Sequence, residues 1–155
     1  MSVEFHEGQL HLQWVPTSGR TCGAEAIQVR PCGDECGRGA FALQRIKRGT
    51  CIGEYEGELL DEEHFWARYP SGTADYCMRI DRTWTLDALA RAGDDSTFSA
   101  CFINHSRQRW NVRRRIYRRD RRILLFTARD IAEHEELLLD YGSQFWHGRE
   151  HQEIL

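Results

Sequence analysis

The stretch Phe102-Ile103-Asn104-His105-Ser106 is followed about thirty residues later by Glu135-Glu136-Leu137-Leu138-Leu139-Asp140-Tyr141-Gly142. Each stretch sets polar side chains against an apolar run. Asn, His and Ser side by side offer side-chain and backbone hydrogen bonds to one ligand, and a Tyr that ends an apolar run can hold its phenol in a dry pocket. The two stretches predict a polar ligand site backed by core residues, with a satisfied core histidine as the alternative for His105.

A glycine pair and an acidic stretch precede these segments. Gly37-Arg38-Gly39 predicts a tight turn, or a turn whose backbone approaches a ligand closely. It is not a dinucleotide fingerprint, because no third glycine and no helix pattern follow it. Glu54-Tyr55-Glu56-Gly57-Glu58 alternates acidic side chains, which is typical of a strand with one solvated face.

Length and composition indicate a single globular domain. The chain has 155 residues, of which 41% are hydrophobic and 11% aromatic, enough to form a core. No apolar run approaches the roughly twenty residues that span a bilayer, and residues 1–12 lack the pattern of a signal peptide. We therefore expect a soluble intracellular protein without a membrane partner.

The hydrophobic pattern predicts a mainly β protein with few short helices. Short alternating runs fill most of the chain, the first at residues 10–14. One helix is expected after Asp61, which is a suitable N-cap, and Pro70 ends it. Strands and helices do not alternate, so a doubly wound nucleotide-binding fold is not expected.

Arginine is concentrated in one segment. Residues 107–122 hold nine arginines and one aspartate, a charge of +8 in a chain whose total is −3. Within this segment, residues 112–117 and 123–127 predict a hairpin that turns at Arg119 and Asp120. The arginines of residues 113–122 either form a solvated face balanced by carboxylates elsewhere, or contact an acidic partner such as a nucleosome or nucleic acid.

The six cysteines predict neither a disulfide framework nor a zinc site. Nothing in the sequence indicates export to an oxidising compartment. Cys22, Cys32 and Cys36 lie close in sequence, but no second pair follows at the short spacing that structural zinc requires. We expect free, buried or half-buried thiols and no bound metal.

Taken together and in this order, the four quoted segments resemble the SET domain of protein-lysine methyltransferases. Ala128-Arg129-Asp130-Ile131, ahead of the second stretch, adds to the resemblance, which covers about residues 27–146. It implies a fold of small sheets with a C-terminal pseudo-knot, in which the end of the chain threads under a loop. It also divides the chain into an N-terminal flank with one strand (residues 1–26), a SET domain (residues 27–147) and a C-terminal tail (residues 148–155).

The resemblance implies S-adenosylmethionine as the cofactor and assigns roles to individual residues. Tyr141 and Tyr76 correspond to catalytic tyrosines, and Leu139 and Phe145 to the substrate channel. The cofactor-binding residues that it implies are Gly37, Arg38, Gly39, Tyr76, Asn104, His105 and Trp146. Whether Phe145 or Trp146 faces the adenine rather than the lysine channel stays open.

The chain departs from the family pattern at several positions. Cys101, Arg107 and His134 stand where the family often has Arg, Cys and Gly, and no cysteine follows Cys101. The zinc-binding cysteine cluster that closes the lysine channel in many members therefore has no counterpart here. The resemblance is to a minimal, stand-alone form whose own tail or a partner chain completes the channel.

These observations lead us to expect methyl transfer from S-adenosylmethionine to a protein lysine, most readily a histone tail lysine. A non-histone protein is the alternative substrate. A rival function is an inactive SET-like module that binds chromatin or nucleic acid through the arginine hairpin. A histone substrate places the protein on chromatin in the nucleus, with the cytoplasm as the alternative.

Overall fold

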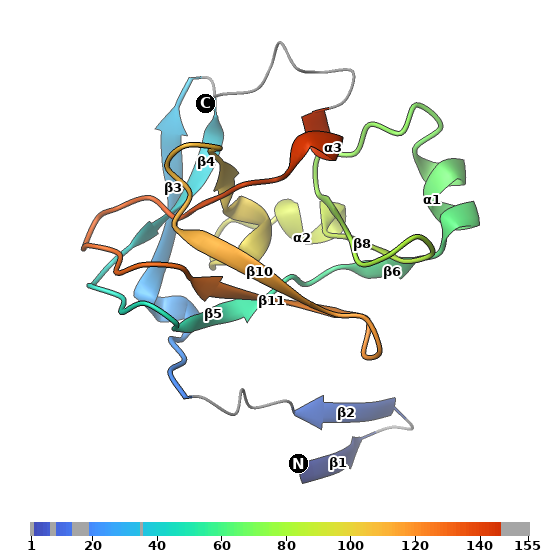
Figure 1. The fold of residues 1–155 in the computed structure, drawn as a ribbon, viewed down its shortest axis with the longest axis horizontal. Helices are drawn as coiled ribbons and strands as arrows, with labels where there is room; N and C mark the ends of the chain where they lie inside the picture. Colours follow the sequence, from blue (N-terminus) through green and yellow to red (C-terminus); the bar gives the residue numbers. More distant parts are fainter. Residues whose placement is uncertain (1, 7–8, 14–18, 35, 147–155) are drawn as a thin grey trace.

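The computed structural model describes residues 2–6, 9–13, 19–34 and 36–146, and most of its elements are short strands (Figure 1). The strands are β1 (Ser2–His6), β2 (Gln9–Gln13), β3 (Ile27–Gly33), β4 (Gly37–Ala42), β5 (Cys51–Glu54), β6 (Glu58–Leu60), β7 (Cys77–Arg79), β8 (Thr85–Asp87), β9 (Asn104–His105), β10 (Val112–Tyr117), β11 (Arg122–Thr127) and β12 (Leu138–Leu139). The helices are α1 (Glu62–Arg68), α2 (Leu89–Ala92) and α3 (Ser143–Trp146), with single 3-10 turns η1 (Ala24–Ala26) and η2 (Ala100–Phe102). The predicted mainly β fold with few short helices is confirmed. Among the described helices, none has the length and apolar character needed to cross a membrane.

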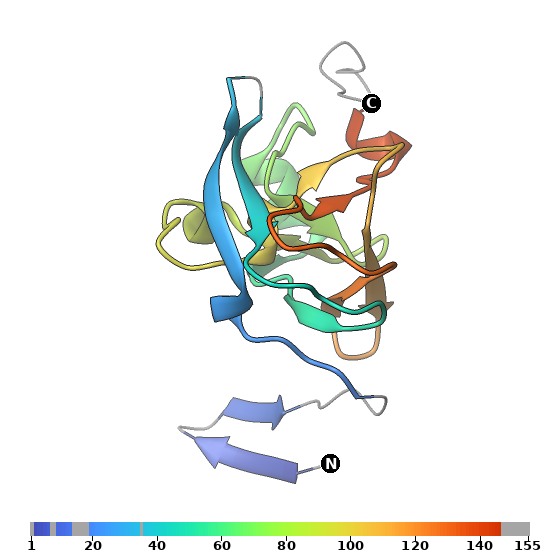
Figure 2. The same cartoon turned by 90° about the vertical axis from the view of Figure 1, so that its left-hand side faces the viewer.

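The strands form four small sheets. The largest has the order β5-β11-β10-β12-β9, a second has the order β6-β8-β7, and β3–β4 and β1–β2 are two-stranded. Figure 1 shows the five-stranded sheet between the β3–β4 hairpin on one side and α1 with β6 and β8 on the other. The β1–β2 pair lies apart from the rest in both views (Figures 1 and 2). The N-terminal flank thus contains two strands where the sequence predicted one, because residues 2–6 pair with residues 9–13.

Strand β11, which lies between β5 and β10, has buried side chains on both faces. Ile123 and Leu125 belong to the main core, whereas Leu124 and Phe126 form a smaller cluster with Cys51 on the outer face of the sheet. The strand pairs with β10 in the register predicted for the arginine hairpin, with Tyr117 opposite Arg122. The continuous apolar run at residues 123–126 therefore serves two clusters, one on each face of the sheet.

Helix α1 begins and ends as the sequence predicts. The Asp61 carboxylate accepts a hydrogen bond from the His64 amide at 2.9 Å, which caps the first turn. Glu62 and Glu63 occupy that first turn, where the positive end of the helix favours acidic side chains. The helix ends at Arg68, two residues before Pro70, since proline cannot continue it.

The C-terminal pseudo-knot arises from the position of β12. Strand β12 lies between β9 and β10 and is parallel to both. Residues 106–111, which join β9 to β10, must therefore cross over β12. This crossing loop holds the segment beneath it through backbone hydrogen bonds from Ser106 to Leu139 at 3.1 Å and from Asn111 to Leu138 at 2.9 Å.

The Asn111 side chain fixes the threaded segment. Its Oδ1 accepts from the Leu138 amide and its Nδ2 donates to the Glu136 carbonyl, both at 2.8 Å. Asn111 is only 1% exposed, so water cannot replace the hydrogen bonds that its side chain makes to these backbone groups. The side-chain amide thus supplies one acceptor and one donor to the threaded backbone, in place of a strand partner that the crossing loop cannot supply.

We expect Asn111→Leu to destabilise the domain by about 2–4 kcal/mol, because two buried backbone groups would lose their partners. Chemical denaturation followed by circular dichroism measures this change. Gln108→Leu is the matched control, since Gln108 is an exposed residue of the same crossing loop. Equal unfolding midpoints for the two variants would show that Asn111 does not hold the threaded segment.

Candidate active site

Asn104 links the glycine segment Gly37-Arg38-Gly39 to Glu136, which lies just before strand β12. Its Nδ2 donates to the Arg38 carbonyl at 2.8 Å and to the Glu136 carboxylate at 3.1 Å. Residues that are 66 and 32 positions apart from it in sequence therefore meet at one amide group. From the sequence, Asn104 and Arg38 are predicted site residues, whereas Glu136 stands only within the motif that ends at Tyr141 and Gly142.

Gly37 and Gly39 are required by the local geometry. Gly37 has a φ of +66°, a conformation that favours glycine. A Cβ on Gly39 would lie 2.6 Å from Oε1 of Glu136, so a larger residue would displace that carboxylate from Asn104. Asp34 and Cys36 lie in turn positions, and Gly37-Arg38-Gly39 starts strand β4 instead of forming the predicted turn. Because the β3–β4 pairing extends to Gly33 and Gly37, the backbone is extended where it meets Asn104.

The Arg38 side chain is bound away from its own carbonyl group. Its NH2 pairs with the Asp95 carboxylate at 2.7 Å, and both side chains are about half exposed. The contribution of Arg38 to the Asn104 cluster is therefore its main-chain oxygen. An exposed pair of this kind stabilises the fold little, but it orients the loop that contains Asp95 against β4.

Tyr141 lies directly after the threaded strand and contacts the Asn104-His105 segment twice. Its amide donates to Nδ1 of His105 at 3.0 Å, and its hydroxyl donates to the Ile103 carbonyl at 2.7 Å. Its ring packs against those of His105 and Phe145, with centroids 5.2 Å and 4.7 Å away. Burial raises the pKa of the Tyr141 phenol, so the group is neutral at physiological pH.

A second buried tyrosine, Tyr55, supports Tyr76. The Tyr55 hydroxyl donates to the Tyr76 carbonyl at 2.8 Å, and burial raises the pKa of the Tyr55 phenol. Tyr76 is half-buried against the main core. The sequence prediction missed Tyr55, although the alternation of Glu54, Tyr55 and Glu56 already indicated an inward-facing tyrosine.

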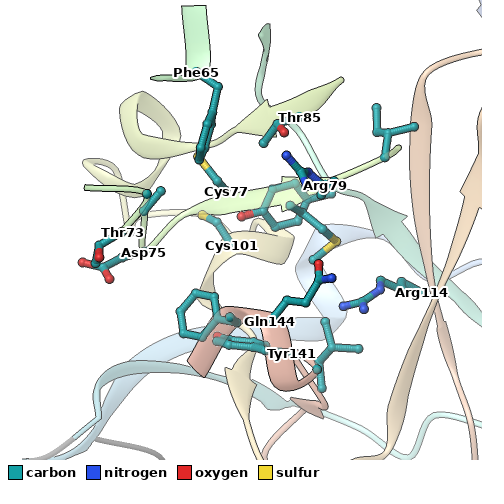
Figure 3. A pocket seen from close by; sticks show the side chains of 18 of the residues that line it. Phe65, Thr73, Asp75, Cys77, Arg79, Thr85, Cys101, Arg114, Tyr141 and Gln144 are labelled. Atoms are coloured by element: carbon teal, nitrogen blue, oxygen red, sulfur yellow. The ribbon is translucent and has the colours of Figure 1, made fainter. Parts of the chain in front are cut away.

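A cavity of about 750 Å³ opens beside Tyr141 (Figure 3). Leu139 and Phe145, the predicted channel residues, both line it, together with Tyr55 and the thiols of Cys77 and Cys101. Burial raises the pKa of Cys77 to about 12, so this thiol is protonated. Tyr76 does not line the cavity, and neither do Gly37, Asn104 and His105.

Tyr141 thus separates two groups of predicted site residues. On one side its amide and ring contact His105, whose neighbour Asn104 binds the glycine segment. On the other side it lines the cavity with Leu139 and Phe145. These predicted residues form two adjoining half-sites, and Tyr76 belongs to neither of them by a described contact. Trp146 ends α3, but its side chain lies outside the described part of the structure, as does the predicted tail at residues 148–155.

The cysteine prediction was wrong at one pair. Cys32 and Cys36 form a disulfide, where free thiols were expected. The short β3–β4 turn places the two residues 5.9 Å apart at Cα, within the range for a disulfide. Cys22, Cys51, Cys77 and Cys101 are free. Across the residues that the structure describes, no group of three or more His, Cys, Asp or Glu could hold a metal ion.

Comparisons with known proteins agree with this geometry. The family model of the SET domain matches residues 37–142. The histone-lysine N-methyltransferase ash1 of Drosophila melanogaster is 34% identical over 113 residues, which are 69% of this chain and 5% of that protein. The N-lysine methyltransferase KMT5A-A of Danio rerio is 32% identical over 118 residues, 70% of this chain and 33% of that protein.

A solved structure supports the fold. A humanized mutant of the Chaetomium thermophilum Polycomb Repressive Complex 2, bound to the inhibitor GSK126, superimposes with a TM-score of 0.61 at 24% identity, over 77% of this chain and 15% of that chain. The chain thus spans a third or less of these relatives. Because the family match runs from Gly37 through the Asn104 cluster to Gly142, just after Tyr141, the chain belongs to the SET-domain family.

Proposed function

We propose that this protein transfers a methyl group from S-adenosylmethionine to the side-chain amine of a protein lysine. The position of Tyr141 carries the proposal, because this residue contacts both the Asn104-His105 segment and the cavity. A methyl donor on one side and an amine on the other could meet only there. The names of the relatives, which are lysine methyltransferases, support the same reaction.

The chemistry of the Asn104 cluster fits the proposed cofactor. S-adenosylmethionine carries a sulfonium and an ammonium group, both positive. The Arg38 carbonyl and the Glu136 carboxylate, which converge on Asn104, are acceptors suited to such groups. The residues proposed to hold the cofactor are Gly37, Arg38, Gly39, Tyr76, Asn104, His105 and Trp146. When bound, the cofactor supplies an electrophilic methyl group.

The cavity side would prepare the amine. A free lysine has a pKa of about 10.4 and must lose its proton before it can attack. Apolar walls such as Leu139, Phe145 and Tyr55 disfavour the ammonium form and exclude water. The neutral Tyr141 phenol, held by Ile103, would then align the amine with the methyl group, and alignment of this kind lowers the barrier substantially. Tyr76, whose carbonyl accepts a hydrogen bond from the cavity residue Tyr55, would assist from behind that wall.

A histone is the first substrate to test, and chromatin in the nucleus the first location. Relatives are named as histone-lysine methyltransferases, one of them specific for lysine 4 of H3 in Neurospora crassa. Labelled cofactor offered with purified histones and with cell extract would identify the substrate, whether histone or not. Cofactor binding without any methylated product would favour the inactive chromatin-binding module instead.

Tyr141→Phe should lower turnover at least about tenfold, since one hydrogen bond to a reacting or aligning group contributes about that much. The affinity for S-adenosylmethionine, measured by isothermal titration calorimetry, should change little because the amide contact to His105 remains. Tyr117→Phe is the control, because Tyr117 packs in the outer-face cluster. Wild-type turnover in the Tyr141 variant would remove this residue from the reaction.

The product should include di- or trimethyl-lysine. Leu139 lines the cavity two residues before Tyr141, and it has no hydroxyl to hold the amine or an ordered water in place. Leu139→Tyr should shift the product towards monomethyl-lysine. Mass spectrometry of a good substrate reads the methylation state directly; only monomethyl-lysine from the wild-type protein would contradict the prediction.

The arginine hairpin is proposed as a contact to nucleosomal or nucleic-acid phosphate, through residues 113–122. Arg122 is not a candidate for this contact, because its side chain makes two hydrogen bonds to Glu54, at 2.8 Å and 2.6 Å. Arg121 stacks on the Trp84 ring at 4.0 Å, which also holds it to the domain. Arg118 and Arg119 are exposed at the hairpin turn.

Arg118→Gln with Arg119→Gln should weaken DNA binding in fluorescence anisotropy. Each lost phosphate contact lowers the slope of log affinity against log salt by about one, so the pair should lower it by about two. Methylation of a short peptide should stay unchanged. Equal loss of peptide methylation would mean that the hairpin turn serves folding or the active site.

A further inference from the structure

The charged side chains around the cavity are unevenly distributed. Three arginines from separate elements line it: Arg79 at the end of β7, Arg82 in the following turn and Arg114 in β10. In Figure 3, Arg79 and Arg114 lie on one side of the cavity, and Thr73 with Asp75 on the other. Tyr141 lies below and between them. Basic and acidic side chains therefore lie on opposite sides of the position proposed for the lysine.

The three arginines have no carboxylate partner in the described part of the chain. All three are exposed, and none takes part in an ion pair among those residues. Arg114 only approaches the Asp140 carbonyl, at 3.5 Å. Arg122, in contrast, donates hydrogen bonds to both carboxylate oxygens of Glu54. Positive charge at this side of the cavity is thus available to a bound molecule.

Asp81, an acidic residue that also lines the cavity, does not neutralise the charge of the three arginines. Asp81 uses its carboxylate to accept from the Thr83 and Trp84 amides, at 2.8 Å and 2.9 Å, and so closes the turn between β7 and β8. These hydrogen bonds lower the pKa of Asp81, with smaller contributions from Arg118 and Arg121. Its charge is directed into the turn, whereas the arginine side chains line the cavity.

We infer that the preferred substrate carries an acidic side chain within a few residues of the target lysine, bound by the cluster of Arg79, Arg82 and Arg114. The inference rests on the proposed methyl transfer and narrows its substrate class. Guanidinium groups bind carboxylates through paired hydrogen bonds. The same cluster repels peptides in which Arg or Lys flanks the target, so it selects against the most basic tail segments.

The test uses three synthetic peptides that share one lysine and differ only at the two positions on each side, which hold Glu, Gln or Arg. The wild-type protein should methylate them in the order Glu, Gln, Arg. The differences should appear mainly in KM, because rim charges contribute to binding and not selectively to the transition state. The differences in KM between the three peptides should become smaller as the salt concentration rises, because salt screens exposed charges.

Arg114→Glu should lower kcat/KM for the Glu peptide roughly fivefold, and it should raise that for the Arg peptide. Arg114→Lys should retain the wild-type order. Arg113→Glu is the matched control: it is the adjacent exposed residue of β10, and alternation places its side chain on the opposite sheet face, with Arg115 over Phe126. Thermal unfolding confirms that each variant is folded.

The outcomes separate the two proposals. Methylation of the Arg peptide as efficiently as the Glu peptide, or an equal effect of Arg113→Glu and Arg114→Glu, overturns the inference and leaves methyl transfer intact. If no peptide is methylated, the proposed function fails, and anisotropy with labelled peptides still decides the inference. Tighter binding of the Glu peptide that is lost in Arg114→Glu supports it, and binding without a charge order overturns it.

Discussion

The hydrogen bonds between the Asn111 side chain and the backbone at Glu136 and Leu138 are the constraint on which this domain depends. Strand β12 enters between two strands whose connection already passes over it, so its backbone groups cannot all be satisfied by regular pairing. A buried amide supplies the missing donor and acceptor. Without it, two polar groups would be buried unpaired, and the threaded position would lose its advantage over an unthreaded one.

The site follows from that threading. Tyr141 stands two residues beyond Leu139, and the register that Asn111 fixes delivers its amide to His105 and its hydroxyl to Ile103. The same register brings Glu136 to Asn104 and hence to the Arg38 carbonyl. One short strand thus orders the groups of predicted site residues on both sides of Tyr141.

Electrostatics divides the arginine-rich half of the chain into groups with different roles. Arg122 is bound by Glu54 and Arg121 by Trp84, and both stabilise the hairpin against the domain. Arg114 instead lines the cavity beside Tyr141. A segment that reads as one basic block in the sequence is therefore partly structural and partly directed at a ligand, according to strand alternation.

Local periodicity, capping residues and ordered motifs were enough to predict the mainly β fold, helix α1 with its Asp61 cap, the arginine hairpin and the family. The sequence also named Tyr141, Asn104 and Gly39 as site residues. The folded chain was needed to show that β12 lies between β9 and β10, that Asn111 holds it, and that Cys32 pairs with Cys36. Those facts depend on contacts between residues far apart in the chain or across a closed turn, and no local pattern carries that information.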